Sequence, residues 1–347
     1  MVDPARAPDP AAVATDDAAW DAFVEAAPNG QYLQLSPWRE VKRPNGWGAF
    51  RVAADAESGP IGAQVLTRRL GPLPLSIGYA PTGPVATAFD VASLRAFTDE
   101  LRAAAPRHRL SHVTVDPTVA GDEAVDALRA AGWRKTRTLQ VDRSWVVDLD
   151  VPEEDLWQGM RSKWRQYVQK SRRAGFVVVD AGAEGIDDLF RIVVETADRA
   201  GFVYRSRDTY RRVYEAYSAG DRARVLLCRA PGGEAVAALM LVRCGTKIVE
   251  PYGGMTAAGA EGRANYLLKW EAMRSSRERG ATLYDMWGMA TAGITQFKQG
   301  FGGREVEYVG AWDLVVNPLG RTAFKAAHAL RVQVGRLRRG DRRRADD

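Results

Sequence analysis

Apolar residues recur along residues 16–148 with the spacing of short strands and amphipathic helices. Trp20, Phe23 and Val24 share one face of a helix that we expect to begin at Asp16 or Asp17. Turn-forming segments rich in Gly and Pro separate the apolar runs that follow it. Those runs predict strands over 49–55, 61–70, 73–80 and 110–115, a strand ending near Asp148, and helices over 91–104 and 121–131.

The second half of the chain repeats this order of elements. Apolar runs there predict strands over 223–229, 235–244, 247–252, 282–286 and 305–316, with a helix over 263–279. Two copies of strand, strand, strand, loop, helix, strand indicate an internal duplication. The order matches the GCN5-related N-acyltransferase type of α/β (α+β) fold, in which a mixed sheet carries helices on both faces.

We therefore predict two tandem acyltransferase-like domains with a cleft between or beside them. The first covers residues 16–150 and is expected to bind the acceptor, and the second covers 151–317 and is expected to carry the donor side and catalysis. Residues 318–347 form a basic C-terminal segment, for which packing back on the first domain is one option.

The helix at 263–279 does not begin like that of an acetyl-CoA enzyme. Such enzymes place an Arg/Gln-x-x-Gly-x-Gly/Ala loop there, whose N–H groups hold the pyrophosphate. The equivalent stretch, Gly259 to Ala264, keeps the Gly-x-Ala end but lacks the leading Arg or Gln, and Glu261 adds negative charge. The first half has Asp90 at this place and no glycine loop, so neither copy is a convincing coenzyme A site.

Basic residues gather in two segments. Residues 161–173 hold six Lys or Arg and no acid, at the end of a helix expected to begin near Pro152. The tail from Arg321 to Arg344 holds nine Lys or Arg and one acid, Asp341, on a pattern typical of an amphipathic helix. Such segments are solvated faces, pack on their own protein, or bind anionic lipid or RNA phosphates.

Composition excludes several classes of protein. The 347 residues are 46% hydrophobic with a net charge of +6, which is typical of a soluble globular protein. Two Cys and three His show no metal-ligand spacing, so we expect no metal and no cofactor. A signal peptide pattern is absent and the longest apolar run, 235–242, is too short to span a bilayer. We expect a cytoplasmic protein with reduced thiols, and peripheral contact with the inner membrane face through the basic tail stays open.

The segment 281–310 carries the densest chemistry. Asp285, Trp287 and Gly288 follow a short strand, and Lys298 stands in a stretch spaced by glycines and aromatics. A lysine in such a loop could stabilise a developing oxyanion, or it could be a solvated residue of a tight turn.

Several motifs, taken in order along the chain, resemble the FemABX family of aminoacyl-tRNA-dependent peptidyltransferases. They span residues 30 to 318, and the last two together are the most specific. They are 34–38 with Lys42, 79–84, 115–117, 164–170, 199–207, 284–288 (Tyr-Asp-Met-Trp-Gly) and 297–302 (Phe-Lys-Gln-Gly-Phe-Gly). The chain has no room for the helical hairpin of larger members, so it is similar to the compact, FemX-like ones.

The resemblance implies transfer of an amino acid from aminoacyl-tRNA to the side-chain amine of a peptidoglycan stem peptide, on a UDP-linked or lipid-linked precursor. It implies catalytic roles for Lys298, towards the oxyanion, and for Asp116, towards the amine proton, with the tRNA ribose hydroxyl as an equal alternative. It implies acceptor binding by Lys42, Trp38, Arg205, Tyr252 and Phe297. Contacts with tRNA are expected from Lys163, Arg165, Arg172, Arg342 and Arg343.

Two other functions stay open at this point. One is an N-acyltransferase that uses an acyl-CoA donor on a sugar or peptide amine, against which the missing loop argues. The other is a non-catalytic RNA-binding module built on the basic helix and tail, which would not need the cleft motifs.

Overall fold

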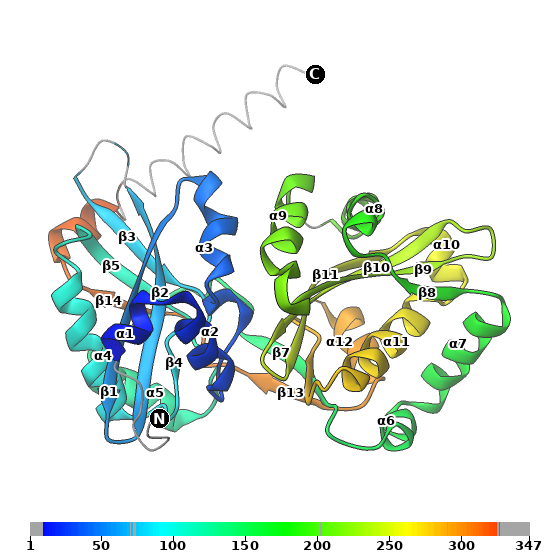
Figure 1. Ribbon diagram of the computed structural model, residues 1–347, viewed down its shortest axis with the longest axis horizontal. Helices are drawn as coiled ribbons and strands as arrows, with labels where there is room; N and C mark the ends of the chain where they lie inside the picture. Colours follow the sequence, from blue (N-terminus) through cyan, green and yellow to red (C-terminus); the bar gives the residue numbers. More distant parts are fainter. Residues whose placement is uncertain are drawn as a thin grey trace, which may run out of the picture.

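The chain folds into two mixed sheets that lie side by side (Figure 1). The structure is a computed structural model that describes residues 10–69, 71, 74–201, 203–289, 291–324 and 326. Arg342 and Arg343 of the predicted tRNA surface lie outside these residues. Among the described helices, none is long and apolar enough to cross a membrane.

The first sheet belongs to the N-terminal half of the chain. It is antiparallel except where β3 runs parallel to β5. The helices α4 (Val91–Ala104) and α5 (Asp122–Ala130) share its core, which includes the buried Phe97, Leu101 and Trp312. The strand order is β1 (Gly48–Ala56), β2 (Gly59–Arg69), β3 (Ser76–Ala80), β5 (Leu110–Val115), β14 (Trp312–Val315) and β6 (Arg134–Lys135), with β4 (Val85–Ala86) also on β2.

The second sheet is antiparallel except for the pair β11 and β12. One core joins it to α6 (Glu153–Gly159), α7 (Ser162–Arg173) and α11 (Ala264–Glu278), and another to α8 (Ile186–Ala200) and α9 (Arg207–Ser218). The strand order is β13 (Arg304–Glu307), β7 (Arg143–Asp148), β12 (Leu283–Asp285), β11 (Lys247–Met255), β10 (Ala235–Cys244), β9 (Ala223–Arg229) and β8 (Val177–Asp180).

Two strands cross the predicted domain boundaries. We predicted that residues 143–148 end the first domain, but β7 lies inside the second sheet between β13 and β12. We predicted one last strand over 305–316 in the second domain. Instead β13 stays in the second sheet while β14 returns to the first and pairs with β5 and β6. Each sheet therefore contains a strand from the other half of the sequence, which ties the halves together.

The helix expected to run from Pro152 through 173 is two helices, because the chain turns at Met160 and Arg161. Met160 is extended (φ −72°, ψ 146°), and Arg161 N–H donates to the Gly300 carbonyl at 2.9 Å instead of continuing α6. The shorter elements are α1 (Pro10–Thr15), α2 (Asp17–Ala26), α3 (Pro37–Lys42), α10 (Ala257–Glu261) and α12 (Ala292–Gln299), with 3₁₀ turns at Tyr32–Gln34, Arg43–Asn45, Gly182–Gly185 and Ala219–Asp221.

A single hydrophobic cluster spans the junction of the two halves. Trp20, Leu35 and Trp38, from the N-terminal helices, are buried in the same cluster as Tyr210 and Tyr217 of α9. α3 and α9 pack against each other between the sheets (Figure 1). Because large aromatic side chains contribute most of the stabilisation of such cores, this cluster fixes the relative position of the halves.

Polar contacts reinforce the junction. The Tyr217 hydroxyl donates to the Tyr32 carbonyl at 2.5 Å. Arg222, which directly precedes β9, pairs with two residues of α2, Asp21 at 3.0 Å and Glu25 at 2.8 Å. The two cysteines are free and buried, as expected, and do not pair.

Candidate functional site

A pocket of about 170 Å³ opens at the junction of the two halves. Four of the five residues predicted to bind the acceptor line it, and they come from both halves of the chain. Lys42 and Trp38 belong to α3, Arg205 to the segment before α9, and Tyr252 to β11. The other lining residues are Tyr32, Leu33, Asn45, Gln140, Thr209, Pro251 and Trp287.

The pocket has two cations that make no ion pair with any described residue. Lys42 Nζ lies 4.7 Å from the centre of the Trp38 ring. No described carboxylate compensates its charge. Burial lowers the pKa of Lys42, and the positive charge of Arg205 lowers it further. Two like charges that affect one another in a half-buried pocket favour a ligand with more than one negative charge.

Aromatic rings form the rest of the wall. Tyr32 packs edge-on against Trp38 at 5.9 Å and against Trp287 at 6.2 Å between ring centres. Tyr252 lies edge-on to Tyr210 at 4.9 Å, and burial raises the pKa of Tyr252 to about 12. At neutral pH these phenols are protonated, so they offer O–H donors without adding negative charge.

Asp116 lies one residue beyond β5 and is 6% exposed. Its carboxylate accepts the Tyr79 hydroxyl at 2.7 Å and the Thr82 N–H at 2.6 Å, and Thr82 takes a left-handed φ of 57° in this turn. Burial raises the pKa of Asp116 to about 7, against hydrogen bonds from Tyr79, Thr82 and Gln140 that lower it. Gln140 also lines the pocket, which connects this carboxyl group to the pocket wall.

Lys298 has a different setting from the one predicted. It lies on the last turn of α12, not in a loop, and is 8% exposed. Its ammonium donates to the carbonyl of Met286 at 2.7 Å and to those of Trp287 and Gly288. An ammonium group has three N–H donors, and all three are used. Burial lowers the pKa of Lys298 to about 8, so the group is still largely protonated at pH 7.

These contacts make Lys298 a positioning residue in this structure, because no donor is left for an oxyanion. The segment that it holds also depends on Asp285, whose carboxylate accepts the Trp287 N–H at 2.8 Å and the Ser144 hydroxyl. Trp287 has a left-handed φ of 50°, which Asp285 and Lys298 together maintain. The Tyr-Asp-Met-Trp-Gly and Phe-Lys-Gln-Gly motifs thus cooperate to place the Trp287 ring in the pocket wall.

Phe297 does not reach the pocket. It packs against Tyr266 and Phe301 at 5.1 Å between ring centres, and its carbonyl accepts the Trp164 indole N–H at 2.9 Å. Because Phe297 precedes Lys298 on a helix, its side chain points to another face. The structure places Phe297 outside this pocket, and its contact with the acceptor stays a prediction.

Of the described residues predicted to contact tRNA, two have other partners. Arg165 donates to the carbonyls of Gln158 at 2.8 Å and Met160 at 3.1 Å, where it closes the end of α6. Arg172 pairs with Glu271 of α11. Lys163 makes no ion pair with a described residue, and its Nζ lies 5.7 Å from the Tyr167 ring centre.

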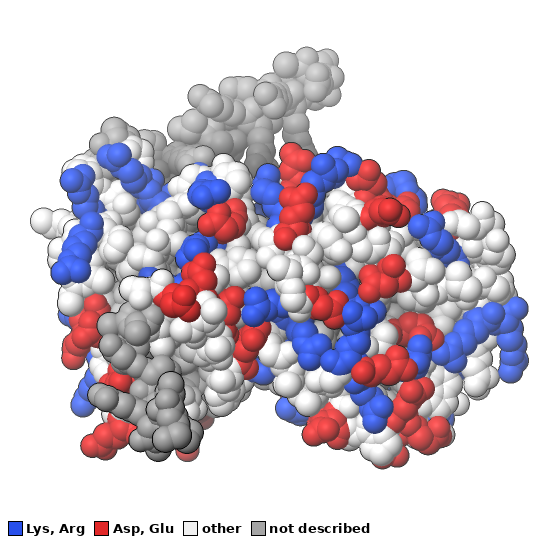
Figure 2. Space-filling model, viewed as in Figure 1, with Lys and Arg blue, Asp and Glu red and all other residues white. Residues whose placement is uncertain are grey.

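Two further cations join Lys163 on this surface. Arg161 is the first residue of the basic segment 161–173 but was not named as a tRNA contact, and Arg263 was not predicted to bind at all. Arg161 lies 5.7 Å above Trp164, and Arg263 lies 4.7 Å above Tyr167. Neither pairs with a described carboxylate, and Figure 2 shows Lys and Arg side chains gathered over α7 at one end of the molecule. We call Arg161, Lys163, Arg263, Trp164 and Tyr167 the α7 surface.

The pocket residues Tyr32 and Gln140 also escaped sequence reasoning. Tyr32 lies in a 3₁₀ turn and Gln140 in an irregular segment, and neither environment leaves a periodic signal. Only the position of Tyr32, two residues before the first family motif, could have suggested it.

The stretch equivalent to a coenzyme A loop is used for internal packing. A Cβ on Gly259 would lie 2.3 Å from the Val236 carbonyl oxygen, and one on Gly262 would lie 2.2 Å from the Phe176 ring. The Gly259 N–H is already taken by the Thr256 hydroxyl at 3.1 Å. These glycines therefore serve close packing rather than an open phosphate cradle.

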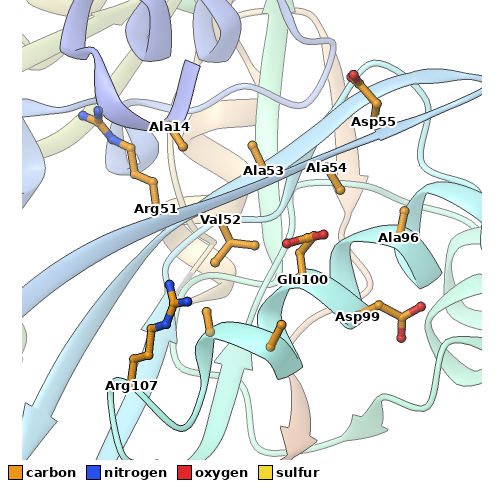
Figure 3. Close-up of a pocket in the computed structure, with 12 residues that line it drawn as sticks. Ala14, Arg51, Val52, Ala53, Ala54, Asp55, Ala96, Asp99, Glu100 and Arg107 are labelled. Atoms are coloured by element: carbon orange, nitrogen blue, oxygen red, sulfur yellow. The ribbon is translucent and has the colours of Figure 1, made fainter. Parts of the chain in front are cut away.

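A larger hollow of about 800 Å³ lies elsewhere, between β1 and α4 (Figure 3). It contains none of the residues predicted for the site. Its charged side chains have both signs, and Arg51, which turns away from Asp99 and Glu100 in Figure 3, already pairs with Asp17 at 2.8 Å. The described residues include no group of three or more His, Cys, Asp or Glu that could hold a metal ion.

Comparison with known proteins agrees with this geometry. Residues 15–124 match the FemAB family, and residues 158–299 match the acetyltransferase (GNAT) domain. The lipid II:glycine glycyltransferase of Staphylococcus haemolyticus (strain JCSC1435) is 24% identical over 86% of this chain and 91% of its own length. These matches, one in each half of the chain, support the resemblance to the FemABX family.

Solved structures support the tandem acyltransferase-like fold of this chain. The crystal structure of FemX aligns with a TM-score of 0.81 at 21% identity, over 88% of this chain and 98% of that one. A tandem GNAT protein from the clavulanic acid biosynthesis pathway aligns with a TM-score of 0.51 at 11% identity, over 86% and 94%. The predicted tandem GCN5-related fold is confirmed, and the protein is an acyltransferase.

A pH titration of the Asp116 carboxyl group tests the raised pKa that its burial produces. We expect its carboxyl ¹³C resonance to titrate near pH 7, and Tyr79→Phe to move the midpoint higher, because the Tyr79 hydroxyl stabilises the ionised form. Folding should be less favourable as the pH rises from about 4 to 7, since the native carboxyl keeps a proton that the unfolded chain has released. Asp116→Asn should remove this pH dependence. A midpoint near 4 in the wild type would contradict the account.

Proposed function

We propose that this acyltransferase moves an amino acid from aminoacyl-tRNA to the side-chain amine of the stem peptide of a lipid-linked peptidoglycan precursor. The observation that supports it best is the pocket between the halves, with Lys42 and Arg205 unpaired and Asp116 close to its wall. The relatives named lipid II:glycine glycyltransferases support this class of acceptor.

The two cations would bind the diphosphate of the precursor. A diphosphate carries several charges within a short span, which matches two unpaired cations that repel one another when the pocket is empty of anions. Trp38, Tyr32 and Trp287 would pack against the sugar and the start of the stem peptide. A UDP-linked precursor has the same diphosphate, so only the group beyond it distinguishes the two forms.

The reaction itself requires modest assistance. The amine nitrogen attacks the ester carbonyl carbon, a C–N bond forms, and the C–O bond to the terminal ribose breaks. The amine has a reference pKa of about 10.4, so its ammonium form first gives one proton to a base or to water; the neutral amine loses a second proton as the amide forms, and the leaving ribose oxygen finally receives one proton. With a pKa of about 7, Asp116 is partly ionised at neutral pH and a better proton acceptor than an ordinary aspartate. The ribose hydroxyl is the alternative route for this proton.

Lys298 would act on this reaction through Trp287. It holds the carbonyls of residues 286–288, so its removal would free the Trp287 wall rather than an oxyanion donor. The donor ester would enter beside this segment from the α7 surface, since Trp164 is hydrogen-bonded to Phe297 on the same helix as Lys298. Aromatic rings with cations above them suit a single-stranded RNA end, because bases stack on the rings and phosphates meet the cations.

An acyl-CoA donor is the second candidate, because residues 158–299 match the acetyltransferase (GNAT) domain. The packing of Gly259 and Gly262 against Val236 and Phe176 disfavours it. The match to enzymes in turn disfavours a non-catalytic RNA-binding module.

The donor can be tested directly. We expect product only with aminoacyl-tRNA, and tRNA affinity that falls steeply with salt because phosphate contacts release counterions. Lys163→Ala and Arg263→Ala should each reduce the slope of log affinity against log salt by about one. Arg129→Ala, an exposed cation on α5 that pairs with Asp126, is the matched control and should change nothing. Turnover with acetyl-CoA in the absence of tRNA would show that the donor is wrong.

The acceptor contacts give a separate test. Lys42→Ala and Arg205→Ala should each weaken precursor binding by about 1.5–3 kcal/mol, the usual cost of a charge-assisted hydrogen bond. Arg43→Ala is the control, because this neighbour of Lys42 is exposed and pairs with Glu40. Calorimetry with a soluble precursor gives the affinities, and melting curves show that the variants fold. Equal affinities for both variants and the wild type would remove the diphosphate assignment.

A further inference from the structure

Exposed apolar side chains lie next in sequence to two residues of the pocket wall. In the described part of the chain, the large hydrophobic residues that are exposed include Val203 at 96%, Leu139 at 57% and Tyr204 at 40%. These three lie on two loops, 201–206 before α9 and 136–142 before β7. Each loop also supplies a residue to the pocket wall: Arg205 from the first and Gln140 from the second.

Leu139 and Val203 contribute little to the packing of the fold, whereas the Tyr204 ring, although exposed, lies edge-on to Phe190 at 6.1 Å between ring centres. A nearly fully exposed valine gains nothing from its own protein, and a free-standing apolar group in water contributes no stability. Along the first loop, Val203 and Tyr204 directly precede the pocket residue Arg205. Isolated exposed apolar residues are ordinary on protein surfaces, but these stand on the two loops that supply Gln140 and Arg205 to the pocket wall.

Cations accompany them on the same rim. Lys42 and Arg205 line the pocket, and Arg137 is an exposed neighbour of Leu139 on the second loop. Apolar side chains flanked by Lys and Arg match the interface of an anionic bilayer, where the former enter the acyl boundary and the latter meet the headgroups. Asp142 and Asp208 adjoin these loops, so the attraction relies on the apolar contacts as much as on charge.

We propose that Leu139, Val203 and Tyr204 form a docking rim that seats the pocket mouth on an anionic membrane surface. The inference rests on the proposed function, because a lipid-linked acceptor presents its diphosphate at the plane of the bilayer. A pocket of about 170 Å³ has room for a group the size of a diphosphate but not for a lipid chain, so the lipid chain would stay in the membrane while the rim holds the protein against it. This surface is separate from the α7 surface proposed for tRNA.

Vesicle sedimentation tests the rim. The purified protein should bind vesicles of phosphatidylcholine with phosphatidylglycerol, and vesicles of phosphatidylcholine alone more weakly. The double variant Leu139→Glu with Val203→Glu should lower the partition coefficient on the order of tenfold or more, because it replaces inserting side chains with charges that the surface repels. Both sites are exposed, so melting curves should be unchanged.

The control is Val177→Glu on β8, which changes an exposed valine (53%) far along the sequence from both loops and should leave vesicle binding intact. Failure of the wild type to bind anionic vesicles, or equal binding by the rim variant and the control, would overturn the proposal. Loss of tRNA retention in the rim variant with vesicle binding unchanged would assign the loops to RNA instead.

The transfer activity with two forms of the acceptor distinguishes the membrane-docking proposal from the proposed function. The rim variant should transfer normally to a water-soluble precursor and poorly to a lipid-linked one in vesicles. Vesicle binding needs neither donor nor acceptor, so it can succeed even where transfer fails. Equal loss on the soluble and the vesicle-borne acceptor would place the rim residues inside the pocket chemistry and refute a docking role.

Discussion

The burial of aromatic side chains across the junction of the two halves is the constraint on which the site depends. Tyr32, Trp38 and Tyr217 belong to one cluster, so moving either half would expose their rings to water. The exchange of β7 and β14 between the sheets adds a covalent reason for the same rigidity. Lys42 and Arg205 come from different halves of the chain. The aromatic cluster and the exchanged strands keep both cations at one pocket although no described anion lies between them.

A second buried arrangement shapes the opposite wall. β11 and β12 run parallel only as far as Asp285, and beyond that point the chain turns into the segment held by Lys298. Behind it, Lys269 pairs with Glu250, and Glu250 accepts the Tyr284 hydroxyl at 2.7 Å. Buried ions of this kind are stable only when each has a partner, and each of these does. The space beyond the paired part of β11 and β12 is therefore filled by the segment that Lys298 holds. Such a filled space suits a donor that arrives from outside the sheet.

Sequence patterns predicted most strands and the helices α2, α4, α5 and α11, because hydrophobic periodicity reflects burial, but they did not predict the core helices α8 and α9. They failed where pairing between strands distant in sequence decides which sheet a strand joins. Nothing local in residues 304–316 shows that Trp312 returns to the first sheet while Val306 stays in the second. The roles of charged side chains failed for a related reason: Lys298 looks like a free cation in sequence, but three carbonyls that satisfy it come from a segment ten residues away.

The family motifs succeeded for the pocket because they mark side chains that meet in space although they are distant in sequence. Lys42, Trp38, Arg205 and Tyr252 were predicted one by one, and the fold brings them to one pocket. Phe297 lies in the last motif but outside the pocket, because neighbouring residues on a helix face different ways. Arg165 and Arg172 of the basic segment have partners within the protein, backbone carbonyls for Arg165 and Glu271 for Arg172.

The central claim is that the pocket at the junction holds an anionic acceptor next to Asp116. A crystal structure with a soluble precursor analogue that keeps the diphosphate and the stem peptide would test it most directly. The account predicts the diphosphate between the Lys42 ammonium and the Arg205 guanidinium, with the acceptor amine directed to the Asp116 carboxylate. Binding of the diphosphate at the start of α11, or anywhere that leaves Lys42 and Arg205 without an anion, would contradict it.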